Sequence, residues 1–104
     1  MIFIETPIFT SDVKAYLDDE AYRALQTHLA DHPEAGPLVE GTGGLRKIRW
    51  AAQGKGKRGG VRAIYYHVVA AQQIRMILIY KKGIMDTLTD RQKTQLCELN
   101  KGWK

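Results

Sequence analysis

Cysteine is nearly absent from this chain, which has 104 residues and a single cysteine, Cys97. One thiol cannot form an intrachain disulfide, and it cannot build a zinc site that rests on several cysteines. A lone cysteine usually behaves as a small apolar residue, and we expect that role for Cys97. The apolar fraction of 44% is ordinary for a globular protein, so we expect the chain to fold around a hydrophobic core.

Long apolar runs are also absent. No stretch approaches the roughly 18 apolar residues of a membrane-spanning helix. The segment from Met1 to Thr6 lacks the basic start and the long apolar run of a signal peptide. We therefore expect a soluble, cytoplasmic protein with no membrane partner. The length and the lack of internal repeats predict a single domain over residues 1–104.

Carboxylates are missing from the middle of the chain. Residues 41–85 contain ten Lys or Arg and no Asp or Glu, whereas the rest of the chain contains six Lys or Arg and all 11 Asp or Glu. The formal net charge of +5 is therefore the sum of a strongly basic middle and acidic flanks. Such segregation predicts one electropositive surface, whose most natural partner is a polyanion.

The first third of the chain predicts a strand and a helical hairpin. Ile2-Phe3-Ile4 is a short run rich in β-forming residues, and Thr6-Pro7 ends it. We expect a first helix to begin at Ser11-Asp12 and a second at Asp18-Asp19-Glu20, where acidic residues suit the helix dipole. His32-Pro33 ends the second helix, because the residue before a proline resists the helical region.

The remainder predicts a sheet and a final helix, and so an α+β fold. A connector rich in glycine and proline leads from Pro33 to Gly44. Three strand-like runs follow it at spacings that fit an antiparallel meander, at residues 45–52, 60–69 and 74–80. Thr89 and Gln92 form a capping box at the start of the last helix. The apolar residues expected on one face of that helix are Leu96, Leu99 and Trp103.

The first of these strands carries alternating cations. Side chains alternate along a strand, so Lys47 and Arg49 share one face, while Ile48 and Trp50 share the other. A strand of this kind is half buried. Its cationic side is either a solvated sheet face or one wall of a groove for an anion, and the sequence leaves both open.

Three further groups of basic and aromatic residues lie in the same segment. They are the loop cations Lys55, Lys57 and Arg58, the set Arg62, Tyr65 and Tyr66, and the strand end Tyr80, Lys81 and Lys82. The simple explanations are a mobile hairpin tip, core tyrosines with wet hydroxyls, and a solvated strand end. Arg62 is the hardest to explain in this way, because its own segment offers no anionic partner. The loop also lacks the ending of a nucleotide-binding P-loop.

The histidines do not predict a metal site. His28 and His32 have metal-compatible helical spacing, but Asp31 is the sole further ligand suggested nearby. His67 lies in an apolar strand and is expected to be structural. The basic segment has no carboxylate to hold a metal ion beside a phosphate. We therefore expect no metal and no cofactor.

A long joint pattern covers most of the chain. It comprises residues 41–49 (GTGGLRKIR), 54–66 (GKGKRGGVRAIYY) and 78–82 (LIYKK), followed by the final helix. This pattern resembles the RelE/HigB toxins of bacterial type II toxin–antitoxin systems, and most closely their HigB-like branch. The resemblance implies a compact, microbial-RNase-like fold, in which an N-terminal strand and a helical hairpin pack on an antiparallel meander that is followed by a C-terminal helix.

The resemblance also implies an activity and its partners. The implied activity is cleavage of mRNA in the A site of the ribosome, which blocks translation. A cognate antitoxin, expected to be a helix-turn-helix DNA-binding protein, would neutralise the toxin and supply its only link to DNA. The catalytic residues implied are Lys47, Arg49, Arg62, Lys82 and Tyr80. The residues implied in RNA or ribosome binding are Arg46, Lys55, Lys57, Arg58, Lys81 and Tyr66.

The family's later basic residue and its C-terminal tyrosine match this sequence less directly. Lys81 and Lys82 are the nearest counterparts of the basic residue, and the choice between them stays open. Thr89 stands near the place of the tyrosine, so Tyr80 and Tyr66 are its candidate replacements.

These residues suit metal-free cleavage of RNA by its own 2′-hydroxyl. We expect Lys47 to act as general base, because neighbouring positive charges favour a neutral amine. Arg49 and Arg62 would hold the scissile phosphate, and Lys81 or Lys82 would assist the leaving oxygen. Two alternatives use the same basic surface. One is a ribosome- or RNA-binding protein without catalysis, and the other is an interaction protein that docks an acidic protein.

Overall fold

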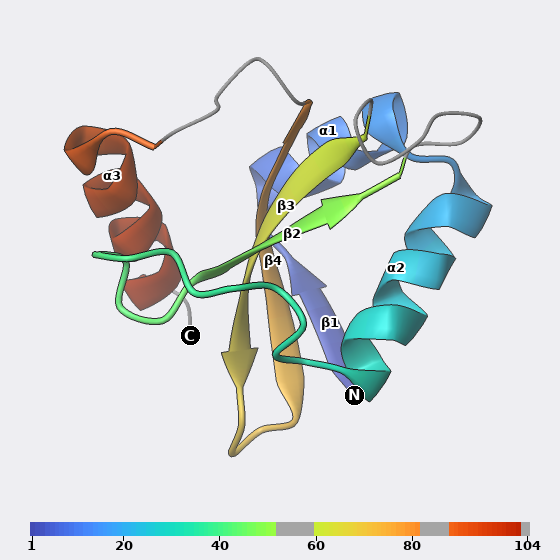
Figure 1. The fold of residues 1–104 in the computed structure, drawn as a ribbon, viewed down its shortest axis with the longest axis horizontal. Helices are drawn as coiled ribbons and strands as arrows, with labels where there is room; N and C mark the ends of the chain where they lie inside the picture. The colour runs from blue at the N-terminus through green and yellow to red at the C-terminus, as the bar shows by residue number, and fades with distance from the viewer. Residues whose placement is uncertain (52–59, 82–87, 103–104) are drawn as a thin grey trace.

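The computed structural model describes residues 1–51, 60–81 and 88–102. Within these ranges the chain folds into three helices and four strands, as Figure 1 shows. Their bounds are β1 Ile2–Glu5, α1 Pro7–Tyr16, α2 Asp19–Asp31, β2 Arg46–Trp50, β3 Val61–Val68, β4 Gln73–Lys81 and α3 Asp90–Lys101. The predicted α+β class is confirmed. None of the described helices has the length and apolar character to cross a membrane.

The four strands form one mixed sheet in the order β1-β4-β3-β2. The pairs β2–β3 and β3–β4 are antiparallel, so the predicted meander is confirmed. β1 joins this meander as an edge strand and runs parallel to β4, with Ile2 opposite Gln73. The other edge of the sheet is β2.

Side-chain caps fix where the two N-terminal helices begin. The prediction that the first helix begins at Ser11-Asp12 was wrong, because Thr6 caps α1 and Pro7 occupies its first turn. A proline suits that position, since the first helical N–H groups have no partner within the helix. The Thr6 hydroxyl accepts a hydrogen bond from the Phe9 N–H at 3.1 Å. The start predicted for the second helix is confirmed, because Asp18 caps α2 by accepting from Ala21 N–H at 2.7 Å.

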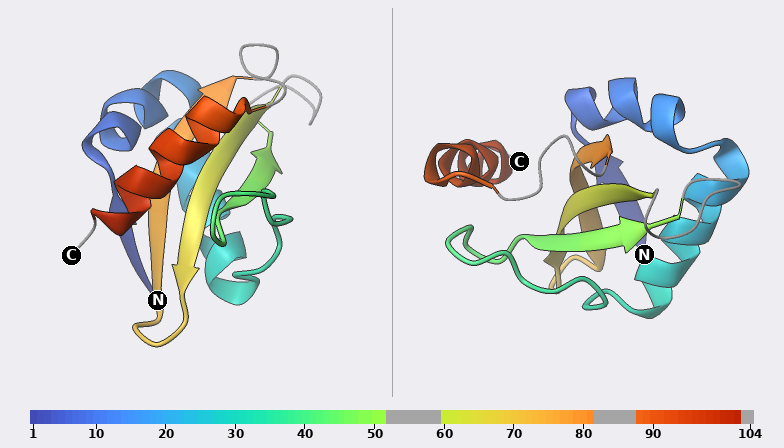
Figure 2. Two further views of the ribbon diagram at one scale, coloured as in Figure 1. Left: turned by 90° about the vertical axis from the view of Figure 1, so that its left-hand side faces the viewer. Right: turned by 45° about the horizontal axis from the view of Figure 1, so that its top comes forward.

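The sheet lies between two hydrophobic cores. Figure 2 shows α1 and α2 on one side of the sheet and α3 on the other. The core beneath α1 and α2 includes Phe9, Leu25, Leu29, Ile48, Tyr65 and Met76. The core on the side of α3 includes Leu45, Ile64, Ile77, Tyr80 and Leu96. β3 and β4 therefore contribute alternate side chains to opposite cores, whereas β2 contributes Ile48 to the core beneath α1 and α2.

The final helix begins as predicted. Thr89 Oγ1 accepts from Gln92 N–H at 3.1 Å, and Gln92 Oε1 accepts from Thr89 N–H at 2.8 Å, which completes the capping box. The predicted apolar face is only partly correct. Leu96 is buried, but Leu99 is 46% exposed, and Trp103 lies outside the described residues. Leu99 follows Leu96 by three positions, which turns it about 60° from the contact line.

Candidate functional site

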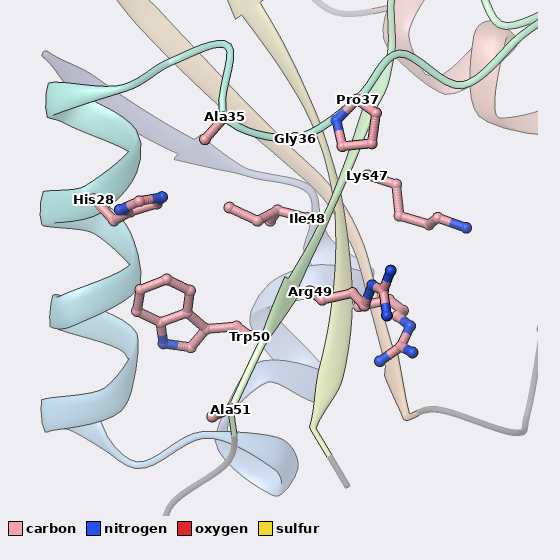
Figure 3. A pocket seen from close by; sticks show the side chains of 10 residues that line it. His28, Ala35, Gly36, Pro37, Lys47, Ile48, Arg49, Trp50 and Ala51 are labelled. Atoms are coloured by element: carbon pink, nitrogen blue, oxygen red, sulfur yellow. The ribbon is translucent and has the colours of Figure 1, made fainter. Parts of the chain in front are cut away.

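Two cations of β2 face away from α1 and α2, as the alternation predicts. Figure 3 shows Lys47 and Arg49 on one side of β2, with Ile48 and Trp50 on the other. Ile48 is 7% exposed and belongs to the core beneath α1 and α2. Arg49 is exposed and Lys47 is half-buried. The prediction that these cations share one face is therefore confirmed.

Arg49 lies opposite Arg62 of β3, and Arg62 lies opposite Tyr80 of β4. The three side chains form a row across the meander, on the face that α3 also covers. We call Lys47, Arg49, Arg62 and Tyr80 the cationic row, since Lys47 is two positions from Arg49 on the same face. The row brings together four of the five residues predicted to be catalytic.

Hydrogen bonding at the edge of the sheet shows how closely the two arginines approach. Lys47 N–H donates away from β3, to Pro37 O at 3.1 Å. Because backbone groups alternate in direction along a strand, Arg49 N–H also points outward. Arg49 and Arg62 are then a non-hydrogen-bonded pair, the kind in which the Cα atoms approach to about 4.5 Å.

This arrangement places two like charges opposite each other on the sheet. Arg62 Nη1 is buried and has no hydrogen-bond partner in the described part of the chain. A buried donor without a partner destabilises the fold by about 1–3 kcal/mol, and like charges opposite one another on a sheet add to that cost. An external anion between the two guanidinium groups would relieve both effects.

The connector from α2 to β2 forms a wall beside the row. Gly36 N–H donates to Tyr65 Oη at 3.0 Å, and Tyr65 Oη donates to Pro33 O at 2.8 Å. A Cβ atom on Gly36 would lie 2.8 Å from Lys47 O, so only glycine allows the connector to come this close. Burial raises the pKa of the Tyr65 phenol, although the hydrogen bond from Gly36 N–H opposes that rise. The phenol therefore stays protonated and keeps its hydrogen bond to Pro33 O.

Arg46, predicted to bind RNA, lies on the other face of β2. Its Nη1 donates to Gly36 O at 2.9 Å and to Glu34 O at 3.4 Å. The structure therefore brings Arg46 to the connector and not to the cationic row. Its guanidinium holds the wall in place.

The remaining predicted residues are spread more widely. Tyr66 is on the face of the row but lies four positions beyond Arg62, about 13 Å along the strand, where the Arg75 guanidinium is 5.8 Å from its ring. Lys81 is exposed at the end of β4, opposite Val61, whose side chain belongs to the core beneath α1 and α2. Alternation thus sets Lys81 on the opposite face from the row. The residues that lie outside the described ranges are Lys55, Lys57, Arg58 and Lys82.

A cavity of about 810 Å³ opens at the edge of β2. Lys47, Arg49 and Arg62 line one part of it, and residues 35–37 of the connector line another. His28 and Trp50 also line it, and the sequence did not predict either as a site residue. Their meeting depends on how α2 packs against β2, which no local pattern reveals.

The described residues do not suggest a metal centre. No group of three or more His, Cys, Asp or Glu in these ranges is arranged to hold a metal ion. His28 and His32 instead contact each other through their rings, with centroids 5.3 Å apart. The cationic row instead favours binding and orienting an anion, through its positive charges and hydrogen-bond donors.

No protein-family model matches the chain. A fold of this kind can serve many functions, so function has to be argued from the site. The chemistry that the site offers is recognition of a phosphate by Arg49 and Arg62, with Lys47 and Tyr80 next to them in the row.

Proposed function

We propose that the protein is the toxin of a type II toxin–antitoxin system, a metal-independent endoribonuclease that cleaves mRNA in the ribosomal A site. The observation that carries this proposal is the facing pair Arg49 and Arg62. Two guanidinium groups with no carboxylate in their own segment form a fork for one phosphate. The finer fold proposed with this function is RelE-like, and the meander with helices packed on it supports that assignment.

Cleavage would proceed by attack of the substrate's own 2′-hydroxyl. The 2′-oxygen forms a bond to phosphorus, its proton passes to Lys47 Nζ, and the bond from phosphorus to the 5′-oxygen breaks. Arg49 and Arg62 stabilise the extra negative charge on the five-coordinate phosphorus. Tyr80 pairs with Arg62 in the row but is only 5% exposed, so we assign donation of a proton to the 5′-oxygen to Lys82, which lies outside the described residues. The products are a 2′,3′-cyclic phosphate and a 5′-hydroxyl.

Dependence on the ribosome follows from what the row contains. Its members are two arginines, one lysine and one tyrosine, without the histidine pair or carboxylate of a strong acid–base catalyst. Holding the 2′-hydroxyl in line with the scissile bond would then supply much of the rate, because orientation alone can lower a barrier by about 7–11 kcal/mol. We assign this positioning to the ribosome, with Lys55, Lys57 and Arg58 as its contacts. The neutralising antitoxin would act by covering the cationic row in the cytoplasm.

The test is cleavage of a defined mRNA by the purified protein, free and on programmed ribosomes, with the ends mapped by primer extension. Arg62→Ala should lower kcat/KM by about 100-fold to about 1000-fold, the usual effect of removing a donor that stabilises a transition-state charge. Lys14→Ala is the control, since Lys14 is an exposed side chain of α1 and its replacement also removes one positive charge. Cleavage by Arg62→Ala at the wild-type rate would refute the assignment.

One alternative is supported by the same row. Its lack of histidine and carboxylate also suits a protein that binds ribosomal RNA without cutting it. Tight, Arg62-dependent binding to ribosomes with no new mRNA ends would select this alternative. An interaction protein would instead bind neither ribosomes nor mRNA.

A further inference from the structure

The cavity at the edge of β2 has two chemically different sides. Lys47, Arg49 and Arg62 lie on the face towards α3, and His28 and Trp50 lie on the face towards α2, as Figure 3 shows for the labelled residues. Both sides belong to one cavity because β2 is the edge strand of the sheet. A ligand can therefore pass round the edge and touch both faces.

The aromatic side is a preformed surface. The ring centroids of His28 and Trp50 are 5.3 Å apart, with 40° between their planes. Trp50 Nε1 donates to Ala21 O at 3.2 Å, which fixes the indole against α2. Both side chains remain half-exposed, so each presents ring surface to the cavity. Planar rings of this kind stack on nucleobases, each base contributing about 1–3 kcal/mol to binding.

The charged side chains are also distributed unequally between the two sides of the cavity. Three cations lie on the α3 side, whereas the neighbouring hollow that shares His28 and Trp50 is lined by two carboxylates, Glu20 and Asp31, and one cation, Arg23. An anionic group is therefore favoured more near Arg49 than near the rings. A ligand with a phosphate at one end and an uncharged planar group at the other fits this division.

The edge of β2 between the two sides also offers hydrogen bonds. Leu38 bridges to Arg46 and Pro37 O accepts from Lys47 N–H, so the connector covers the first half of the strand. The outward N–H of Arg49 has no such partner among the residues described. It can donate to a phosphate or to the edge of a base that lies over the strand.

We propose that this cavity is a nucleotide subsite, in which His28 and Trp50 hold an RNA base while Arg49 and Arg62 hold the phosphate attached to it. This inference rests on the proposed function, and it names the part of the substrate that the aromatic side binds. The volume of about 810 Å³ lies within the range of roughly 300–1,000 Å³ typical of small-molecule sites. The mRNA strand would cross β2 at this point, with its base on one face of the sheet and its backbone on the other.

The test measures binding of a short RNA without cleavage. We would use the Trp103→Phe background, which leaves Trp50 as the only tryptophan. The first probe is a trinucleotide with 2′-deoxy sugars, and the second probe is the same trinucleotide without its central base. Stacking should quench Trp50 fluorescence, and loss of the base should weaken binding by about 5-fold to about 150-fold, which corresponds to 1–3 kcal/mol. His28→Ala should remove much of this difference between the probes.

Two further variants separate stacking from folding. Trp50→Phe keeps an aromatic ring and should retain base-dependent binding, measured by titration of a labelled probe, whereas Trp50→Leu should lose it. His67→Ala removes a histidine from the far end of β3, opposite Ile74, and should leave the difference between the probes unchanged. Circular dichroism spectra confirm that each variant is folded.

Each failure has a distinct signature. Equal affinity of wild type for both probes, or no binding of either at millimolar concentration, would overturn the nucleotide subsite. If Arg62-dependent cleavage on ribosomes persisted in that case, the proposed function would stand without it. Base-dependent quenching without any cleavage on ribosomes would instead refute the nuclease and keep the subsite.

Discussion

Arg49 and Arg62 face each other directly across β2 and β3. Arg62 Nη1 is buried and has no hydrogen-bond partner in the described part of the chain. Within the described part of the chain, the pair therefore carries unfavourable electrostatics at the point where the proposed substrate binds. Stability and function should respond in opposite directions to changes at this pair.

Replacing Arg62 by an apolar side chain of similar length tests this opposition. Arg62→Met should raise the free energy of unfolding by about 1 kcal/mol, because it removes an unpaired buried donor and a like-charge contact. The same change should lower kcat/KM for cleavage on ribosomes by about 100-fold to about 1000-fold, as expected for Arg62→Ala. Urea denaturation at low and high salt measures the first effect, and the gain should shrink at high salt. A loss of stability would show that Arg62 is paired in the folded protein.

The phosphate contact of Arg49 should be visible in the salt dependence of ribosome binding. Each neutralised phosphate contributes about 0.7–0.9 to the slope of log K against log salt concentration, so Arg49→Ala should reduce the magnitude of that slope by nearly one. Lys57→Ala in the loop should have a similar effect if that residue contacts ribosomal RNA. Filter binding over a salt series gives the slope. An unchanged slope for Arg49→Ala would remove Arg49 from the phosphate contacts.

Thr6 joins the first helix to the centre of the sheet. Its hydroxyl accepts from Phe9 N–H at 3.1 Å and donates to Ile77 O at 2.7 Å, and the residue is 3% exposed. Thr6→Val keeps the shape but removes both bonds, which should lower the free energy of unfolding by about 1–3 kcal/mol. The control is Thr94→Ala, at an exposed position of α3, which should change the free energy of unfolding by less than about 0.5 kcal/mol. Equal effects of the two changes would contradict this role.

Tyr22 should make the protein less stable at high pH. Burial, and then the hydrogen bond that its hydroxyl donates to the Glu5 carboxylate, raise the pKa of Tyr22 well above its ordinary value of about 10. The unfolded chain loses the phenolic proton near pH 10 while the folded chain keeps it, so the free energy of unfolding falls as pH rises above about 10.

Urea denaturation near pH 8 and above pH 10 measures this fall. Burial also raises the pKa of Tyr65, so wild type should show the contributions of both phenols. Tyr22→Phe should reduce the fall with pH, and Tyr16→Phe serves as the control. The same pH dependence in Tyr22→Phe as in wild type would rule out a contribution from Tyr22.

Local signals explain which parts of the fold could be predicted. Asp18 and Thr89 start helices through contacts within three residues, and the alternation of Lys47 and Arg49 is a property of any strand. The start of α1 was misplaced because Ser11-Asp12 resembles a cap, whereas Thr6 is the cap that the structure uses. The parallel pairing of β1 with β4 joins opposite ends of the chain, and no short pattern encodes it.

The candidate site divides in the same way. The facing of Arg49 and Arg62 follows from the register between two neighbouring strands, so a meander prediction comes close to it. The bonds of Arg46 to the connector depend on the path of residues 33–37, which its glycine and proline content does not specify. The contact of His28 with Trp50 depends on the packing of α2 against β2, and each residue alone has an ordinary structural explanation.

The Thr6 hydroxyl and the Ile77 carbonyl that it binds are 71 positions apart in the chain. Contacts of such long range form late and slow the folding of a domain, because a large loop must close before they are gained. During synthesis, β1 emerges before β4 and has no strand to pair with until β4 has been made. The meander also lacks the strand that carries Tyr80 until then, so a growing chain cannot present the complete cationic row before β4 has been added.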